Sequence, residues 1–85
     1  MSDQELSYAL AVKKKHERAL MRKRNVVGVG VGFRQRAGHD TDQVCIVVSV
    51  SQKKRLAELD PRDVIPRVLE NVPVDVQETG PFRAF

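Results

Sequence analysis

The stretch that most constrains the fold is NVVGVGVGF, residues 25–33, in which valine alternates with glycine. Alternation at every second position is the period of a β-strand, whose successive side chains point to opposite faces. One face then carries valine and phenylalanine, and the other carries the structural glycines Gly28, Gly30 and Gly32. Each glycine inside a strand costs roughly 0.5–1 kcal/mol relative to alanine, so three need a compensating reason. We predict that the bare face is buried under a closely packed helix.

A phosphate-binding glycine loop is the competing interpretation of this stretch. Its glycines do not follow the dinucleotide-binding spacing GxGxxG, because the third one comes a residue early and the segment continues as strand instead of opening a helix. No acidic residue stands in a second strand about 20 residues further on, and no GKS or GKT of a Walker loop occurs. The sequence therefore predicts no nucleotide cofactor.

Residues 3–22 have the pattern of an amphipathic helix. At about 100° per residue, the apolar side chains spread over one broad side. Lys13 and Glu17 fall inside that arc, at the i,i+4 spacing that favours an ion pair. The opposite side carries a basic stripe, which is either a solvated face or a docking surface for nucleic acid or an acidic protein. Its candidate partner-binding residues are Lys14, Lys15, Arg18 and Arg22.

The remaining chain alternates strand patterns with turn signals. Residues 34–42 are polar and predict a hairpin loop with Gly38 at its turn, and residues 43–51 alternate valine and isoleucine with small residues. A short helix is expected at residues 53–59, and Asp60 followed by proline is typical of a helix cap.

The chain ends with a second hairpin pattern. A turn at Glu70 and Asn71 should join a short strand at residues 67–69 to a half-exposed strand at residues 72–76. The prediction is one α+β domain over residues 1–85, in which an N-terminal helix packs on a three- to four-stranded, mainly antiparallel sheet. This arrangement is an αββαβ-like two-layer sandwich.

No group of residues predicts catalysis, a cofactor or a metal site. Cys45 lies inside an apolar strand, where a small buried thiol is the usual role, and His39 with Asp40 lacks the paired spacing of metal ligands. His16 is expected at the rim of the helix's apolar face. A single cysteine, the lack of a signal peptide and the lack of a long apolar segment favour a cytoplasmic protein without a membrane partner.

The net charge of +4 is unevenly distributed. Residues 1–36 contain nine Lys or Arg against three acids, whereas residues 37–85 contain six against eight. The basic excess would attract an acidic partner, which keeps nucleic acid as an alternative. Against that alternative, the strands carry valine and glycine where an RNA-binding sheet carries stacking aromatics.

The chain resembles a known bacterial family over about residues 20–85. It is similar to the N-terminal segment that precedes trypsin-like peptidase domains in many bacterial proteins of poorly defined role. The resemblance lies in the order of NVVGVGVGF, Thr41-Asp42, the strand at 46–50, Lys53-Lys54, Ile65-Pro66, the strand at 72–76 and Gly80. Asn71 departs from the family's commoner glycine, and the chain ends at Phe85, where the peptidase part would begin.

The resemblance implies a non-enzymatic accessory or pro-segment-like module that acts by contact. We expect it to work through exposed sheet edges and the basic helix. Its partner would be a protein, either a trypsin-like peptidase or a second copy of the chain in a homodimer. The alternative is a basic module that binds nucleic acid through the helix stripe.

Overall fold

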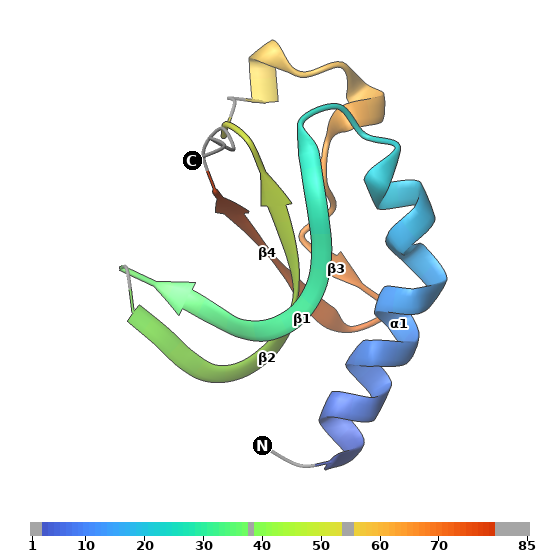
Figure 1. Ribbon diagram of the computed structural model, residues 1–85, viewed down its shortest axis with the longest axis vertical. Helices are drawn as coiled ribbons and strands as arrows, with labels where there is room; N and C mark the ends of the chain where they lie inside the picture. Colours follow the sequence, from blue (N-terminus) through green and yellow to red (C-terminus); the bar gives the residue numbers. More distant parts are fainter. Residues whose placement is uncertain (1–2, 38, 54–55, 80–85) are drawn as a thin grey trace, which may run out of the picture.

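The computed structural model describes residues 3–37, 39–53 and 56–79. One N-terminal helix is followed by a four-stranded mixed sheet, which confirms the predicted α+β class (Figure 1). Helix α1 spans Asp3–Met21, as its periodicity predicted. Four residues named above, Gly38, Lys54, Gly80 and Phe85, lie outside the described residues.

Strands β1 (Val26–Arg36) and β2 (His39–Val50) form a long antiparallel hairpin. The prediction of a loop over residues 34–42 was wrong, because pairing continues to Gln35↔Asp40 and Arg36↔His39. Polar residues on both faces remove the hydrophobic alternation that marks a strand, yet the backbone can still pair. The true connection is therefore much shorter than the polar segment.

The crossover after β2 contains two single turns of 3₁₀ helix, η1 (Leu56–Glu58), which lies inside the short helix expected at residues 53–59, and η2 (Pro61–Asp63). The predicted cap is confirmed, since the Asp60 carboxylate accepts a hydrogen bond from the Arg62 backbone N–H at 3.0 Å. The crossover leads into β3 (Val68–Leu69) and β4 (Val72–Glu78).

The predicted turn at Glu70 and Asn71 joins β3 to β4, and both residues have positive φ, 47° and 70°. The strand order is β1-β2-β4-β3, with β4 parallel to β2 and the other two pairs antiparallel. Pro73 pairs only with Val68 of β3, because the β2 ladder begins at Val74. A proline has no N–H to donate, so its place at the end of the ladder avoids a missing bond.

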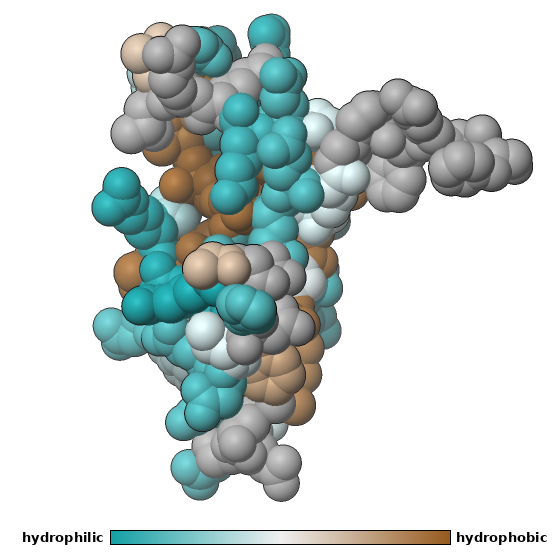
Figure 2. Space-filling view, turned by 90° about the vertical axis from the view of Figure 1, so that its left-hand side faces the viewer, coloured by the Kyte–Doolittle hydropathy of each residue, from teal (hydrophilic) through white to brown (hydrophobic). Residues whose placement is uncertain are grey.

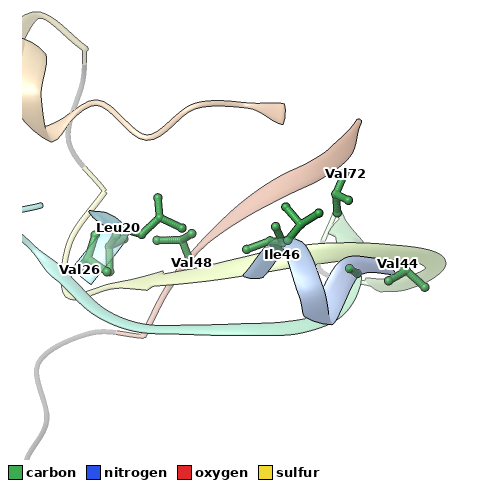
Figure 3. Packing of buried hydrophobic residues seen from close by; sticks show 9 residues of the cluster. Leu20, Val26, Val44, Ile46, Val48 and Val72 are labelled. Atoms are coloured by element: carbon green, nitrogen blue, oxygen red, sulfur yellow. The ribbon is translucent and has the colours of Figure 1, made fainter. Parts of the chain in front are cut away.

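The core lies between α1 and one face of the sheet. Figure 3 shows Val48 of β2 beside Leu20 and Val26, and Ile46 and Val44 further along the strand on the side of Val72. Aliphatic side chains on this face supply the apolar area whose burial holds the helix on the sheet, at roughly 25 cal/mol per Å². The buried hydrophobic residues are Ala9, Val12, Leu20, Val26, Val44, Cys45, Ile46, Val48, Val50 and Val72.

The glycine face points away from α1, so the prediction that the helix covers it was wrong. Directly paired residues of antiparallel strands share a face, and Gly28, Gly30 and Gly32 stand opposite Ser49, Val47 and Cys45. The helix packs instead on the face of Ile46 and Val48. Sequence alternation distinguishes two faces, but the face with more apolar area is the one that attracts the helix.

The β1–β2 hairpin curls away from α1, so the glycine face lies inside the curve (Figure 1). A Cβ atom added at Gly32 would lie 3.3 Å from Val47 Cγ2, whereas one added at Gly30 would meet nothing within 4 Å. Close packing therefore explains Gly32 but not Gly30. Figure 2 looks onto this side of the molecule, where hydrophilic residues surround a strip of hydrophobic ones.

Candidate interaction surfaces

Strand β1 forms one border of the sheet, and its outer backbone edge is open. Only β2 pairs with it, and among the described residues no backbone hydrogen bond outside that ladder involves residues 28–33. Register irregularities lie on either side of this segment, between Val26 and Gly28 and between Phe33 and Gln35. The segment itself carries no charge and no proline. We call residues 28–33 the β1 edge.

The opposite border of the sheet is protected in the ways that sheets commonly use. Strand β3 is only two residues long, and the strand next to it carries Pro73, Asp75 and Glu78. Short edge strands, prolines and charges all discourage pairing with another chain. The β1 edge has none of these devices within its six residues, so it is the border suited to receive another strand.

Exposed hydrophobic side chains lie beside the β1 edge. Val27 is 39% exposed and Phe33 is 38% exposed, at the two ends of the segment. On α1, Leu10 is 49% exposed and Met21 is 47% exposed. Leu10 and Met21 belong to the apolar side of the predicted helix, and helical periodicity alone did not state that they would remain exposed.

Leu10 and Met21 share one flank of α1. With about 100° per residue, they lie only about 20° apart around the helix axis, and on the side opposite Tyr8 and Lys15. Tyr8 and Lys15 reach Glu70 in the β3–β4 turn. Because α1 packs mainly on β1 and secondly on β2, the opposite flank overhangs the β1 edge. We call Leu10, Lys13, Glu17 and Met21 the overhanging flank.

The predicted ion pair between Lys13 and Glu17 lies on this flank and is confirmed, with Lys13 Nζ 2.6 Å from Glu17 Oε2. The pair is neutral as a unit. The overhanging flank therefore presents two apolar side chains on either side of a charge-compensated centre.

The basic stripe divides into two parts. Lys14, Arg18 and Arg22 are exposed and follow one another at i,i+4 spacing along α1. Lys15 is drawn away from this row, with its Nζ 3.4 Å from Glu70 Oε1. Lys15 is also exposed, but its ion pair directs it to the β3–β4 turn, whereas the other three form a row along α1.

Glu70 ties the β3–β4 turn to α1. Its backbone carbonyl accepts a hydrogen bond from the Tyr8 hydroxyl at 2.7 Å, and its carboxylate lies 2.8 Å from His16 Nε2. The hydrogen bond with His16, followed by the one from Lys15, lowers the pKa of Glu70 below its ordinary value. His16 is half-buried at the rim of the helix's apolar face, as predicted, and its partner is structural.

The chemistry of Cys45 is that of a buried structural thiol. Its side chain is fully buried on the glycine side of β2. Burial, with a smaller contribution from the nearby Asp75 carboxylate, raises the pKa of Cys45 to about 11. A thiol with so high a pKa is a poor nucleophile near neutral pH. His39 lies exposed at the hairpin tip.

The described residues include no group of three or more His, Cys, Asp or Glu side chains placed to hold a metal ion. Within the same residues, α1 is too polar to cross a bilayer, and no other helix has the length. An open hollow of about 530 Å³ lies between the start of α1 and the β3–β4 turn, lined among others by Tyr8, Asp42 and Pro73.

Comparison with known families places this fold. Residues 4–77, from α1 to near the end of β4, match the family described as the NARROW LEAF 1 N-terminal domain. No curated protein matches the chain. The matching family is a plant-type domain, so the resemblance to a bacterial module ahead of trypsin-like peptidases was wrong. The chain belongs to the NARROW LEAF 1 N-terminal domain family.

Proposed function

We propose that this domain is a non-enzymatic protein-interaction module that binds its partner by backbone pairing along the β1 edge. The observation that carries the proposal is the contrast between the two borders of the sheet. One border ends in a short strand beside proline and acidic residues, whereas the other offers six uncharged residues whose outer backbone edge pairs with no strand among the described residues.

The two faces of the β1 edge indicate what kind of strand fits it. Val29 and Val31 point to the helix side and are only half-buried, so apolar side chains of an added strand would extend the core there. The glycines on the other face leave the backbone bare. When an extended segment adds to a sheet edge, main-chain hydrogen bonds supply affinity and alternate side chains supply specificity. The partner is thus an extended segment with an apolar residue at every second position.

Site-specific photo-crosslinking tests the proposal. A benzoylphenylalanine residue at the Phe33 position, the last residue of the β1 edge, should give protease-sensitive crosslinked products in cells that express the full chain. The matched control is the same residue at the Val68 position of β3, which is more exposed but lies at the protected border. Equal crosslinking at both positions, or none at Phe33, would contradict the proposal.

Nucleic-acid binding is the second candidate, and the exposed row Lys14, Arg18 and Arg22 favours it. If each cation contacted one phosphate, affinity for a DNA duplex should fall about 40-fold between 50 and 200 mM salt. The double substitution Arg18→Glu with Arg22→Glu should abolish that binding, whereas Lys53→Glu, an exposed lysine outside the row, should have little effect. Fluorescence anisotropy with a labelled duplex measures the affinity of each variant and how that affinity depends on salt concentration. Weak binding whose affinity changes neither with salt concentration nor with either set of substitutions would exclude nucleic-acid binding as the function.

The cellular setting that we propose is the cytoplasm. Its support is the single cysteine, Cys45, which is buried as a free thiol. Free buried thiols persist in reducing compartments.

A further inference from the structure

We infer that the partner of the β1 edge is a second copy of this chain, paired β1 to β1 in antiparallel orientation about a two-fold axis that passes midway between the two Gly30 residues. This inference rests on the proposed function, because it requires the β1 edge to be a binding surface. It adds the identity of the strand that binds there. Four observations carry it: the symmetry of the sequence, the overhanging flank, the matching positions of helix and strand, and the direction of the curl.

The sequence around Gly30 is nearly the same in both directions. At equal distances from Gly30 stand Gly28 and Gly32, then Val29 and Val31, and then the two exposed residues Val27 and Phe33. In a symmetric antiparallel pair, each residue lies opposite its counterpart across the axis. Valine would then meet valine on the helix side, glycine would meet glycine on the bare side, and no charge would be opposed within the β1 edge.

Gly30 itself is left unexplained by the single chain. A Cβ atom at this position would meet nothing within 4 Å, so no contact within the chain requires glycine. On a two-fold axis the same residue lies opposite itself, with the two Cα atoms about 4.5–5.5 Å apart. With glycine at both positions, the bare side of the joined sheet stays uncharged at the centre of the interface, so nothing there opposes backbone pairing.

The overhanging flank of α1 is self-complementary about the same kind of axis. Antiparallel contact of two such flanks puts Leu10 near Met21 of the second copy, and Lys13 near Glu17 of the second copy. The flank's exposed apolar side chains would be buried, and its charges would meet opposite charges. A standard interface buries roughly 800 Å² per partner, so six residues of strand need this helical contribution.

The centre of the β1 edge and the centre of the overhanging flank lie at similar distances from the turn that joins α1 to β1. Gly30 lies four residues beyond Val26, about 13 Å along the strand. The midpoint of Lys13 and Glu17 lies six residues before Met21, about 9 Å along the helix, which runs in the opposite direction. Because Met21 and Val26 are joined by a short turn, one two-fold axis can pass close to both centres.

The curl of the hairpin is compatible with this axis. An axis perpendicular to the sheet at Gly30 maps the concave side of one copy onto the concave side of the other. Both α1 helices then lie on the convex side, where Figure 1 shows the helix. The result is a continuous sheet with the two helices side by side, which adds burial to a small domain that buries a smaller share of its surface than larger domains do.

Sedimentation equilibrium with paired charge variants tests the inference. The wild-type chain of 9.6 kDa should reach twice that mass at high concentration and dissociate on dilution. Gly30→Glu and Gly30→Lys each put like charges across the axis, so each should weaken self-association by about tenfold or more. An equimolar mixture of the two variants should associate at least as well as the wild type, because opposite charges then face each other.

Gly30→Thr is the control for substitution at this position, since its side chain is uncharged and suited to a strand. It should keep a native circular dichroism spectrum and an association constant closer to that of the wild type than either charged variant. Restored association in the Glu and Lys mixture supports the two-fold axis. A wild type that is monomeric at every concentration, or a mixture that stays as monomeric as its components, overturns it. If crosslinking at Phe33 still captures another protein, the β1 edge remains a binding surface and only the identity of the partner was wrong.

Discussion

At the scale of single residues, Asn25 connects the end of α1 to the end of β2. Its φ of 76° is a left-handed conformation, which asparagine tolerates better than most residues. Its side chain bonds to Ser51 and to the backbone of Gln52, and its carbonyl accepts from the Ser51 N–H at 3.0 Å. One residue therefore closes the turn between α1 and β1 and ties that turn to the end of β2.

Two substitutions of Asn25 should separate the contribution of its side-chain hydrogen bonds from that of its left-handed backbone conformation. Asn25→Ala loses the side-chain hydrogen bonds and also strains the backbone, so the free energy of unfolding should fall by about 2–3 kcal/mol. Asn25→Gly loses the same bonds without the strain, so its free energy of unfolding should fall by roughly 1 kcal/mol less than that of Asn25→Ala. Urea unfolding measures both variants. Equal losses would show that the positive φ carries no strain.

Glu70 gives stability that depends on pH. Its pKa is lower in the folded chain than the ordinary value of 4.5, chiefly through the hydrogen bond with His16. A lowered folded pKa contributes stability above the unfolded pKa and loses it as pH falls through the folded pKa. The melting temperature should therefore decline below about pH 4.5, and Glu70→Gln should flatten part of that decline. The same substitution at exposed Glu78 is the control, and an equal flattening there would contradict the role of Glu70.

At the scale of elements, alternation predicted which segments are strands but not how they are covered. It located the β1–β2 and β3–β4 hairpins because apolar residues recur at every second position. It assigned the glycine face to the helix because periodicity does not state which face is buried. The polar residues 34–42 hid the strand ends for a related reason, since pairing there is carried by the backbone alone.

The glycine face yields a matched pair of substitutions in β1. Gly30→Ala adds a Cβ atom into open space and should raise the free energy of unfolding by about 0.5 kcal/mol, because the unfolded chain loses freedom. Gly32→Ala places its Cβ 3.3 Å from Val47 Cγ2, so the increase in the free energy of unfolding should be cancelled or reversed at this position. Urea unfolding at low protein concentration, where any dimer dissociates, compares them. A loss at Gly30 as large as at Gly32 would mean that the face is covered at both positions.

At the scale of the whole molecule, the candidate surfaces depend on strand order, which no local pattern states. The sequence showed that β1 and β2 pair, but β1 is a border only because β4 adds to the other side of β2 in parallel. Lys15 shows the same limitation, because its partner Glu70 is 55 residues away along the chain. Helical spacing alone predicted the row of Lys14, Arg18 and Arg22. The overhanging flank could be recognised only once the position of the helix on the sheet was known.

The overhanging flank provides the last prediction, which concerns association of whole chains. Lys13→Glu removes the ion pair within α1 and, in the inferred dimer, opposes two carboxylates across the axis, so association should weaken about three- to tenfold. Adding Glu17→Lys exchanges the two charges and restores both pairs, and acid before base is the better order in a helix. The association constant measured by sedimentation equilibrium should then return close to the wild-type value. If the exchanged variant associates as weakly as the single one while its helix content is normal, the flank does not face its own copy.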